Sequence, residues 1–254
     1  MLYRLVFILF GLAVLLTQRP AAALAVNEPA QPLAAARQLV LVIAADWDSN
    51  AGLMRCYERA TADGAWVRVG SDVPVSLGRS GLGWGRGVHA AQLIAGPMKR
   101  EGDGKAPAGV FLFGEAFTSA PSELGNMDLP TLTTSATLFC VDDVNSRFYN
   151  TLQDTSSVSP DWNSSESMLR EDGLYRHGLI VRHNSDPVEP GAGSCIFFHI
   201  WKGVGQSTAG CTAMSAEDLT RLLRWLDEKN APVLVQLPEE ALATAVKAWG
   251  LPAR

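Results

Sequence analysis

The sequence has few of the residues that build metal and redox sites. Its 254 residues include four histidines and four cysteines, with no His-x-His, no His-Glu-x-x-His and no closely spaced cysteine pair. Those are the spacings that protein metal sites use. His177 and His183 with an acid such as Asp142 or Asp143 are one alternative set of zinc ligands, but this set lacks such a motif. The sequence therefore predicts no metal site and no cofactor.

Long hydrophobic runs are missing after the first residues of the chain. The apolar run Leu5–Leu16 is too short to span a bilayer and has the length of a signal-peptide hydrophobic region. Ala23–Ala25 then has the small-x-small form that signal peptidase cleaves. We expect residues 1–25 to be a signal peptide and the mature protein to be periplasmic or secreted, without a membrane span. An uncleaved N-terminal anchor is the alternative.

Positive charge is also scarce. Removing residues 1–25 takes away Arg4 and Arg19 and no acid, which leaves 19 basic and 26 acidic residues and a formal charge of about −7. This balance argues against nucleic acid as a partner. Residues 26–37 read as a flexible lead-in with two prolines, and residues 38–254 are enough for one domain with a substantial core. No internal repeat is visible.

Short apolar runs separated by turn residues predict a mainly β fold with α additions. Asp46–Gly52 and Thr61–Gly64 have the Asp, Asn and Gly content of hairpin turns, so we expect the first four strands to form a meander. Two long polar connections, 118–135 and 155–167, are either functional lids or mobile loops. The runs expected to be strands are 38–45, 53–59, 65–69, 73–77, 110–113, 138–141, 174–183, 194–201 and 232–237.

Two helices are expected near the C-terminus. Ser215 offers an N-cap hydroxyl with acids in the following turn, and leucines then recur at helical spacing up to Leu226. A second helix is expected over 239–249, between Pro238 and Gly250.

Cys211 and His199 are the candidate catalytic residues. Cys211 lies in the segment Gln-Ser-Thr-Ala-Gly-Cys-Thr (206–212), twelve positions after a histidine that ends an apolar strand. A free thiol is a weak nucleophile until a base takes its proton, and an imidazole can do so and later protonate a leaving amine. The pattern predicts acyl transfer by a cysteine nucleophile. The alternative, that Cys211 is a small buried core residue, stays open.

The loop around Cys211 is expected to supply an oxyanion hole. Gly210 permits a tight turn, so that backbone N–H groups around Cys211 and Thr212 point at a developing oxyanion, with Ala209 in the same loop.

Strand periodicity assigns the residues of 194–201 to two faces. Ile196, Phe198 and Ile200 are expected to face the core, and Cys195, Phe197, His199 and Trp201 the wall of a cleft. Four residues of strand, about 13 Å, separate Cys195 from His199, so Cys195 is not the nucleophile that this histidine activates.

Cys195 and Cys140 either form a disulfide in an oxidising compartment, leaving Cys211 free, or stay reduced. Cys56 is expected in the core.

Two separated motifs carry a family resemblance. Residues 99–111 read Lys-Arg-Glu-Gly-Asp-Gly-Lys-Ala-Pro-Ala-Gly-Val-Phe, and His199 and Ser-Thr-Ala-Gly-Cys (207–211) follow much later. In this order they resemble the L,D-transpeptidase catalytic-domain family of peptidoglycan enzymes, over roughly Gln38–Leu237. The resemblance implies an L,D-transpeptidase-like β-sandwich or barrel with a helix after the catalytic Cys loop, and one catalytic domain over 38–254.

The resemblance also implies the reaction. The cysteine attacks the carbonyl of an L-configured centre in a peptidoglycan stem peptide, releases a terminal D-amino acid and forms a thioester. An amine of a second stem then takes the acyl group, in cell-wall biogenesis that maintains cell shape. If water takes it, the enzyme is an L,D-carboxypeptidase or endopeptidase. A catalytically silent wall-binding module is the third possibility.

The chain departs from the commoner family pattern at two positions. Ala209 stands where His or Lys is frequent, and Ala213 where Arg is frequent. Substrate anchoring must then come from other residues. The candidates are Trp201, His177, Arg182, His183 and Lys202.

Overall fold

A computed structural model describes residues 31–252 of the protein. The expected signal peptide, residues 1–25, and the first part of the expected lead-in lie outside the described residues. Within 31–252, no helix combines the length and the apolar character that crossing a bilayer requires.

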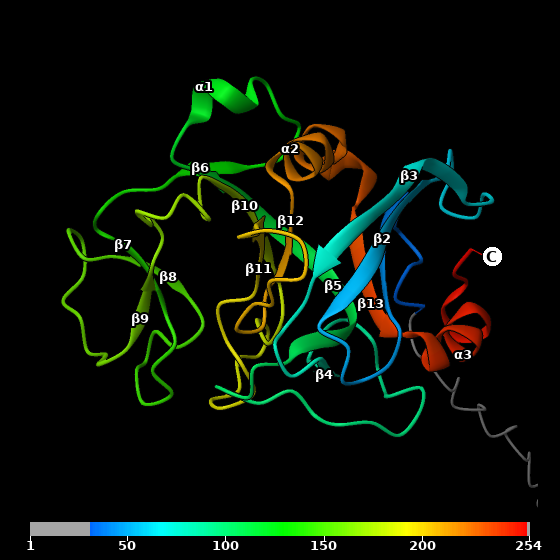
Figure 1. The fold of residues 1–254 in the computed structure, drawn as a ribbon, viewed down its shortest axis with the longest axis horizontal. Helices are drawn as coiled ribbons and strands as arrows, with labels where there is room; N and C mark the ends of the chain where they lie inside the picture. Colours follow the sequence, from blue (N-terminus) through cyan, green and yellow to red (C-terminus); the bar gives the residue numbers. More distant parts are fainter. Residues whose placement is uncertain (1–30, 253–254) are drawn as a thin grey trace, which may run out of the picture.

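The main sheet closes into a barrel. Its strands follow one another in the order β10-β11-β12-β3-β2-β1-β13-β5, and β10 also pairs with β5 (Figure 1). The short strands β4 (Leu82–Trp84) and β6 (Thr131–Thr133) lie beside β5. The barrel strands are β1 (Gln38–Ala44), β2 (Ala51–Glu58), β3 (Val67–Ser76), β5 (Ala106–Thr118), β10 (His177–Val181), β11 (Phe197–Ile200), β12 (Thr212–Met214) and β13 (Val233–Pro238). The prediction of a mainly β fold is confirmed, in its barrel form.

The hydrophobic core fills the barrel and continues under two helices. All seven residues of β1 are buried, which agrees with the apolar run that follows Gln38. Helix α3 (Glu239–Trp249) packs on β13, and helix α2 (Ala216–Trp225) packs on β10 and β11. Both helices occupy the ranges expected from the sequence, and the Ser215 hydroxyl caps α2 by accepting from the Asp218 N–H.

The meander has three strands where four were expected. Residues 65–69 and 73–77 belong to the single strand β3, which pairs with β2 along its length. The residues between 69 and 73, which suggested a turn, form an irregularity inside β3. Gly70 has a φ of +66°, and the pairing with β2 shifts register between Met54 and Cys56. β10 and β11 are shorter than the expected runs 174–183 and 194–201.

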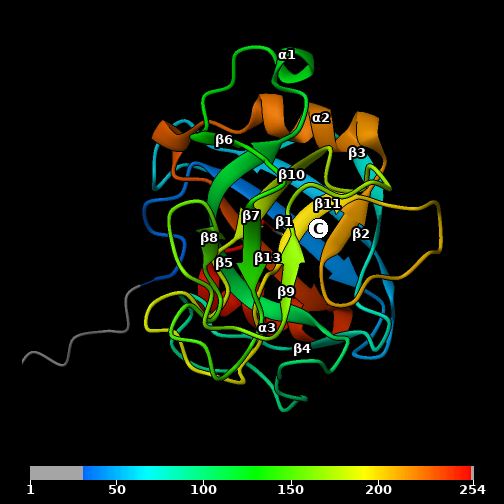
Figure 2. The same ribbon diagram turned by 90° about the vertical axis from the view of Figure 1, so that its left-hand side faces the viewer.

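A second, smaller sheet stands at one side of the barrel. It has the strand order β8-β7-β9 and consists of β7 (Leu138–Val141), β8 (Leu152–Asp154) and β9 (Ser165–Ser167). We call it the side sheet. Figure 2 looks onto it, with the barrel strands behind. The polar connection 118–135 contains the short helix α1 (Pro121–Leu124) and β6, and the connection 155–167 contains β9, so both segments have short elements of their own.

A disulfide and a separate apolar cluster join the side sheet to the barrel. Cys140 of β7 is bonded to Cys195, just before β11, with 5.9 Å between their Cα atoms. Cys56 and Cys211 are free, and Cys56 is only partly buried against the core. The cluster between the two sheets consists of Phe117, Cys140, Met168, Tyr175, Cys195, Phe197 and Cys211. The candidate nucleophile therefore lies where the side sheet meets the barrel.

Candidate functional site

The pairing of β11 with β12 brings Cys211 and His199 to one face of the barrel. These strands are parallel, with His199 opposite Ala213. Side chains alternate along a strand, so Cys211, two positions before Ala213, points to the same side as His199. Both side chains line one cavity of about 230 Å³. The expected division of 194–201 into two faces also holds, since Ile196 and Phe198 lie in the barrel core and Cys195 and Phe197 in the second cluster.

The loop that carries Cys211 is held against a neighbouring segment by backbone hydrogen bonds. Thr208 N–H donates to Leu77 O and Arg79 N–H donates to Thr208 O, both at 2.9 Å. The Thr208 hydroxyl donates to Cys211 O at 2.6 Å and accepts from Gly210 N–H at 3.1 Å. The two hydrogen bonds of the Thr208 hydroxyl thus hold the Ser-Thr-Ala-Gly-Cys segment in a tight turn before the cysteine.

Gly210 is required by close packing. A Cβ atom at this position would come 3.0 Å from the carbonyl oxygen of Lys105. Lys105 belongs to the turn of the Lys-Arg-Glu-Gly-Asp-Gly-Lys motif, so the two motifs of the sequence meet in space here. A larger residue at position 210 would make a tight contact with that turn, at a backbone φ of +156° that side chains disfavour.

Asp103 holds the turn of the first motif together. Its carboxylate accepts from Lys99 Nζ at 2.6 Å, Arg100 N–H at 2.7 Å and Lys105 N–H at 2.8 Å. The Lys99 side chain is buried, and its ammonium also donates to Arg100 O at 2.6 Å. The segment therefore forms a tight turn, and the ion pair between Lys99 and Asp103 stabilises it.

The oxyanion-hole residues have other partners in this structure. The Gly210 N–H is engaged by Thr208, as above, and the Thr212 hydroxyl donates to Gln236 Oε1 at 2.8 Å in the barrel interior. Ala209 lines the cavity with its methyl group. Of the backbone N–H groups near the sulfur, the one that points at it is that of Phe197, at 3.3 Å from Sγ.

The Cys211 thiol is buried in its resting position. It is 6% exposed, and its S–H donates to Cys195 O at 3.5 Å. Burial raises the pKa of the thiol to about 12, and the charge of Glu166 acts in the same direction, whereas the Phe197 N–H acts to lower it. At neutral pH the sulfur is therefore a thiol.

The His199 ring has a defined tautomer. Its Nδ1 lies 2.8 Å from Ile200 O. A carbonyl oxygen can only accept, so Nδ1 carries the proton and Nε2 has the lone pair. Burial lowers the pKa of His199 to about 4, and the Tyr175 ring packs against the imidazole with centroids 5.2 Å apart. The resting pair is a neutral thiol and a neutral imidazole with its basic nitrogen available.

The side sheet and the segment that returns from it supply residues that sequence analysis missed. Glu166, Arg170, Leu174 and Tyr175 line the same cavity as Cys211. Glu166 lies in β9 and accepts from the Tyr175 hydroxyl at 2.5 Å. The only sequence signal for them was the length of the polar connection 155–167, interpreted as a possible lid.

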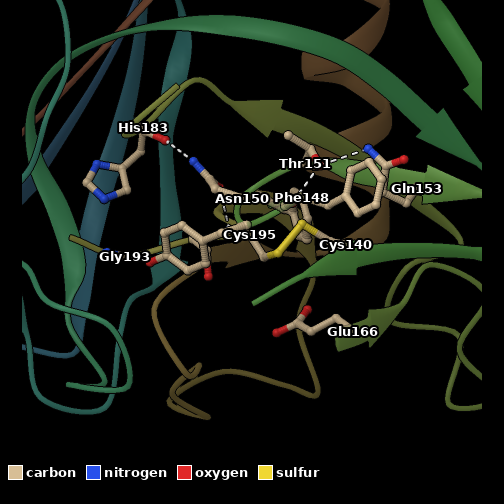
Figure 3. The surroundings of a disulfide bond; sticks show 12 residues. Cys140, Phe148, Asn150, Thr151, Gln153, Glu166, His183, Gly193 and Cys195 are labelled. Carbon is tan, nitrogen blue, oxygen red and sulfur yellow. Dashed lines mark hydrogen bonds between the residues drawn. A yellow bond between two sulfur atoms is a disulfide. The ribbon is translucent and has the colours of Figure 1, made fainter. Parts of the chain in front are cut away.

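A disulfide fixes the backbone beside the nucleophile (Figure 3). Cys195 has a φ of +54°, which is strained for a residue with a side chain. Asn150 supports this conformation because its Oδ1 accepts from Cys195 N–H at 2.9 Å, while its Nδ2 donates to His183 O at 2.9 Å. In this conformation the Cys195 carbonyl faces the Cys211 thiol.

The expected substrate-binding residues are divided among several places. Trp201 and Lys202 line the Cys211 cavity. Arg182 lines a separate, larger cavity of about 990 Å³ that contains no cysteine. His177 contacts Thr118 and Glu123 beside α2, and His183 is buried and bonded to Ala192 O at 3.0 Å. The structure therefore does not bring Arg182, His177 or His183 to the nucleophile.

The two histidines also do not meet in a metal-binding arrangement. Strand β10 ends at Val181, before His183. Asp143 is used by the turn that follows β7, where it accepts from the N–H groups of Asn145 and Asn163. No group of three or more His, Cys, Asp or Glu side chains in the described part of the chain is placed to hold a metal ion.

A family model described as the L,D-transpeptidase catalytic domain, YkuD, matches residues 53–235, which is more than half of the chain. No curated protein and no solved structure matches the sequence.

Replacing Asp103 by Asn should destabilise the protein strongly. The change leaves the buried Lys99 ammonium without a counter-charge, and breaking a buried ion pair costs about 3–5 kcal/mol. Chemical denaturation measures the free energy of unfolding. Asp48→Asn is the control, because Asp48 forms an exposed, long ion pair with Lys105 at 3.9 Å and should cost less than about 1 kcal/mol. Equal losses in both variants would contradict this role of Asp103.

The Cys211 thiol should stay protonated well above neutral pH. With a pKa near 12, its thiolate absorbance in the ultraviolet should be absent at about pH 7 and appear only in strongly alkaline solution. The measurement is the difference in absorbance between the parent protein and Cys211→Ala during a pH titration. A thiolate signal from residue 211 below about pH 8 would show a preformed ion pair with His199 instead.

Proposed function

Because the chain belongs to the L,D-transpeptidase catalytic-domain family, we propose that it is an L,D-transpeptidase, a cysteine acyltransferase acting on peptidoglycan stem peptides through a thioester. The observation that carries the proposal is the cavity shared by Cys211 and His199, with the lone pair of His199 on Nε2. Family members modify peptidoglycan with a cysteine, and this chain has the required thiol, a base and room for a peptide carbonyl.

The first half of the proposed reaction acylates Cys211. His199 Nε2 takes the thiol proton as the sulfur attacks the carbonyl carbon of the L-configured centre. The Phe197 N–H, 3.3 Å from Sγ, stabilises negative charge as it develops on the sulfur. The imidazolium then gives its proton to the nitrogen of the leaving D-amino acid, the C–N bond breaks, and a thioester remains.

The second half transfers the acyl group. An amine of another stem attacks the thioester carbonyl, its proton passes to His199, and the C–S bond breaks to regenerate the Cys211 thiol. The Ile200 carbonyl keeps Nδ1 protonated and Nε2 basic through both halves, which is what a base that works twice requires.

Hydrolysis is the second candidate, and two side chains of the cavity favour it. Ala209 and Ala213 line the cavity with methyl groups where many family members carry polar side chains. The usual stem is then anchored less firmly, and water can compete for the thioester. The same Cys211 and His199 chemistry would make the protein an L,D-carboxypeptidase or endopeptidase.

We also propose that the protein works outside the cytoplasm, in the periplasm or after secretion. The disulfide between Cys140 and Cys195 supports this location, because such bonds persist in oxidising compartments. It also leaves Cys211 as a free thiol beside the disulfide.

Incubation of the mature protein with tetrapeptide muropeptides, followed by mass analysis, tests the proposal. Dimers indicate transfer and shortened monomers indicate hydrolysis. Cys211→Ala should abolish both products, and Cys56→Ala, which removes the other free thiol, should retain them. A carbapenem should add its mass to the parent and to Cys56→Ala but not to Cys211→Ala. Binding of muropeptides without any product would instead identify a silent wall-binding module.

A further inference from the structure

Glu166 is a carboxylate beside the nucleophile that the reaction described above does not use. It lines the Cys211 cavity from β9, together with Tyr175, Trp201 and Lys202. Its Oε2 accepts from the Tyr175 hydroxyl at 2.5 Å. Burial raises the pKa of the Glu166 carboxyl, the Tyr175 hydrogen bond and the charge of Arg170 act to lower it, and the charge of Asp142 acts to raise it.

Among the described residues, no cationic side chain lies close enough to Glu166 to form an ion pair, although the charge of Arg170 acts on it from a greater distance. The nearby Arg170 guanidinium is engaged by Asp172, with Nε–Oδ1 and NH2–Oδ2 distances of 3.0 and 2.5 Å, and it lies 5.1 Å from the centre of the Tyr175 ring. Within residues 31–252, no Lys, Arg or His side chain forms an ion pair with Glu166. A half-buried carboxylate without an ion-pair partner is partly desolvated, and an incoming cation would offset part of that cost.

Glu166 is also linked to the surroundings of Cys211 through strand pairing and a disulfide. It stands opposite Cys140 in the pairing of β7 with β9, and Figure 3 shows it on the strand next to that of Cys140. Cys140 is bonded to Cys195, whose carbonyl accepts from the Cys211 thiol. This chain of contacts holds the carboxylate at a set position relative to the sulfur, as a binding group for a reacting atom must be.

We propose that Glu166 is the acceptor-binding residue, which holds the ammonium of the attacking primary amine in the Cys211 cavity. The proposal rests on the proposed acyl transfer and names the residue that selects an amine over water. It gives the side sheet a function, since the sheet brings to this cavity a half-buried carboxylate that forms no ion pair.

Atoms and charges balance in the transfer step when Glu166 accepts a proton from the ammonium. The ammonium R–NH₃⁺ gives one proton to the Glu166 carboxylate and becomes a neutral amine. The amine nitrogen bonds to the thioester carbonyl carbon, and its second proton passes to His199 Nε2. The C–S bond breaks, and the Cys211 sulfur takes that proton from His199. Glu166 returns its proton to water, so the products are an amide, the free thiol and one released proton.

The test separates acylation from transfer in the Glu166→Gln variant. Glutamine keeps the size of the side chain and an oxygen that accepts from Tyr175, but removes the charge. Acylation of Cys211 by a tetrapeptide muropeptide, measured by intact mass, should not slow, because removal of the Glu166 charge takes away one cause of the raised pKa of the thiol. Transfer to a primary amine acceptor should fall about 10- to 100-fold, the effect expected from the loss of a charged hydrogen-bond partner. Unchanged transfer, or equal loss in both steps, would overturn the proposal.

Two controls make the result specific. Hydroxylamine is uncharged at neutral pH, so its reaction with the thioester should be the same in parent and Glu166→Gln, whereas a misfolded cavity would slow it as well. Glu171→Gln makes the same charge change at an exposed residue five positions along the chain and should leave every step unaltered. If the parent itself forms no acyl-enzyme, the proposed function fails. If the parent acylates and Glu166→Gln uses amines equally well, only the role of Glu166 fails.

Discussion

The parallel pairing of β11 with β12 determines the chemistry that this protein can perform. It places the sulfur of Cys211 beside the Phe197 N–H and on the same side of the sheet as the His199 ring. Parallel neighbours need a long connection, and here the connection is the loop that ends in Ser-Thr-Ala-Gly-Cys. That loop is bonded to Leu77 and Arg79 and packed on the Gly-Asp turn through Lys105. Most of the surrounding contacts therefore serve to hold one short strand in register.

Burial sets the resting state of the catalytic pair. The same low-dielectric surroundings raise the pKa of Cys211 and lower that of His199, so both groups are neutral at the pH where the enzyme would work. A neutral pair is protected from non-specific alkylation and oxidation, which act on thiolates. The thiolate then forms only as the proton moves to Nε2 with a carbonyl in place. The side sheet contributes to this burial, and the disulfide keeps it attached.

Sequence analysis identified the candidate nucleophile and base but missed the side-sheet residues that line the same cavity. The period of two over 194–201 assigned Phe197 and His199 to the cleft side, and the Gly-Cys motif pointed to residue 211, because these signals are local. Glu166 was missed because its strand is three residues long within a Ser-rich, polar segment that has the composition of a loop. Its strand pairing and the disulfide depend on contacts between distant segments, which no local pattern encodes. His177 and His183 were placed by residue type alone, and each has structural partners elsewhere.

The most direct test of the account is the rate at which a carbapenem acylates Cys211 in the parent and in His199→Asn. Removing a general base lowers a reaction rate about 10²–10⁴-fold. At neutral pH the variant should therefore be acylated more slowly by that factor, and its acylation rate should rise with pH as the thiolate fraction grows. Equal rates in parent and variant at neutral pH would contradict the account, because the thiol would then lose its proton without His199.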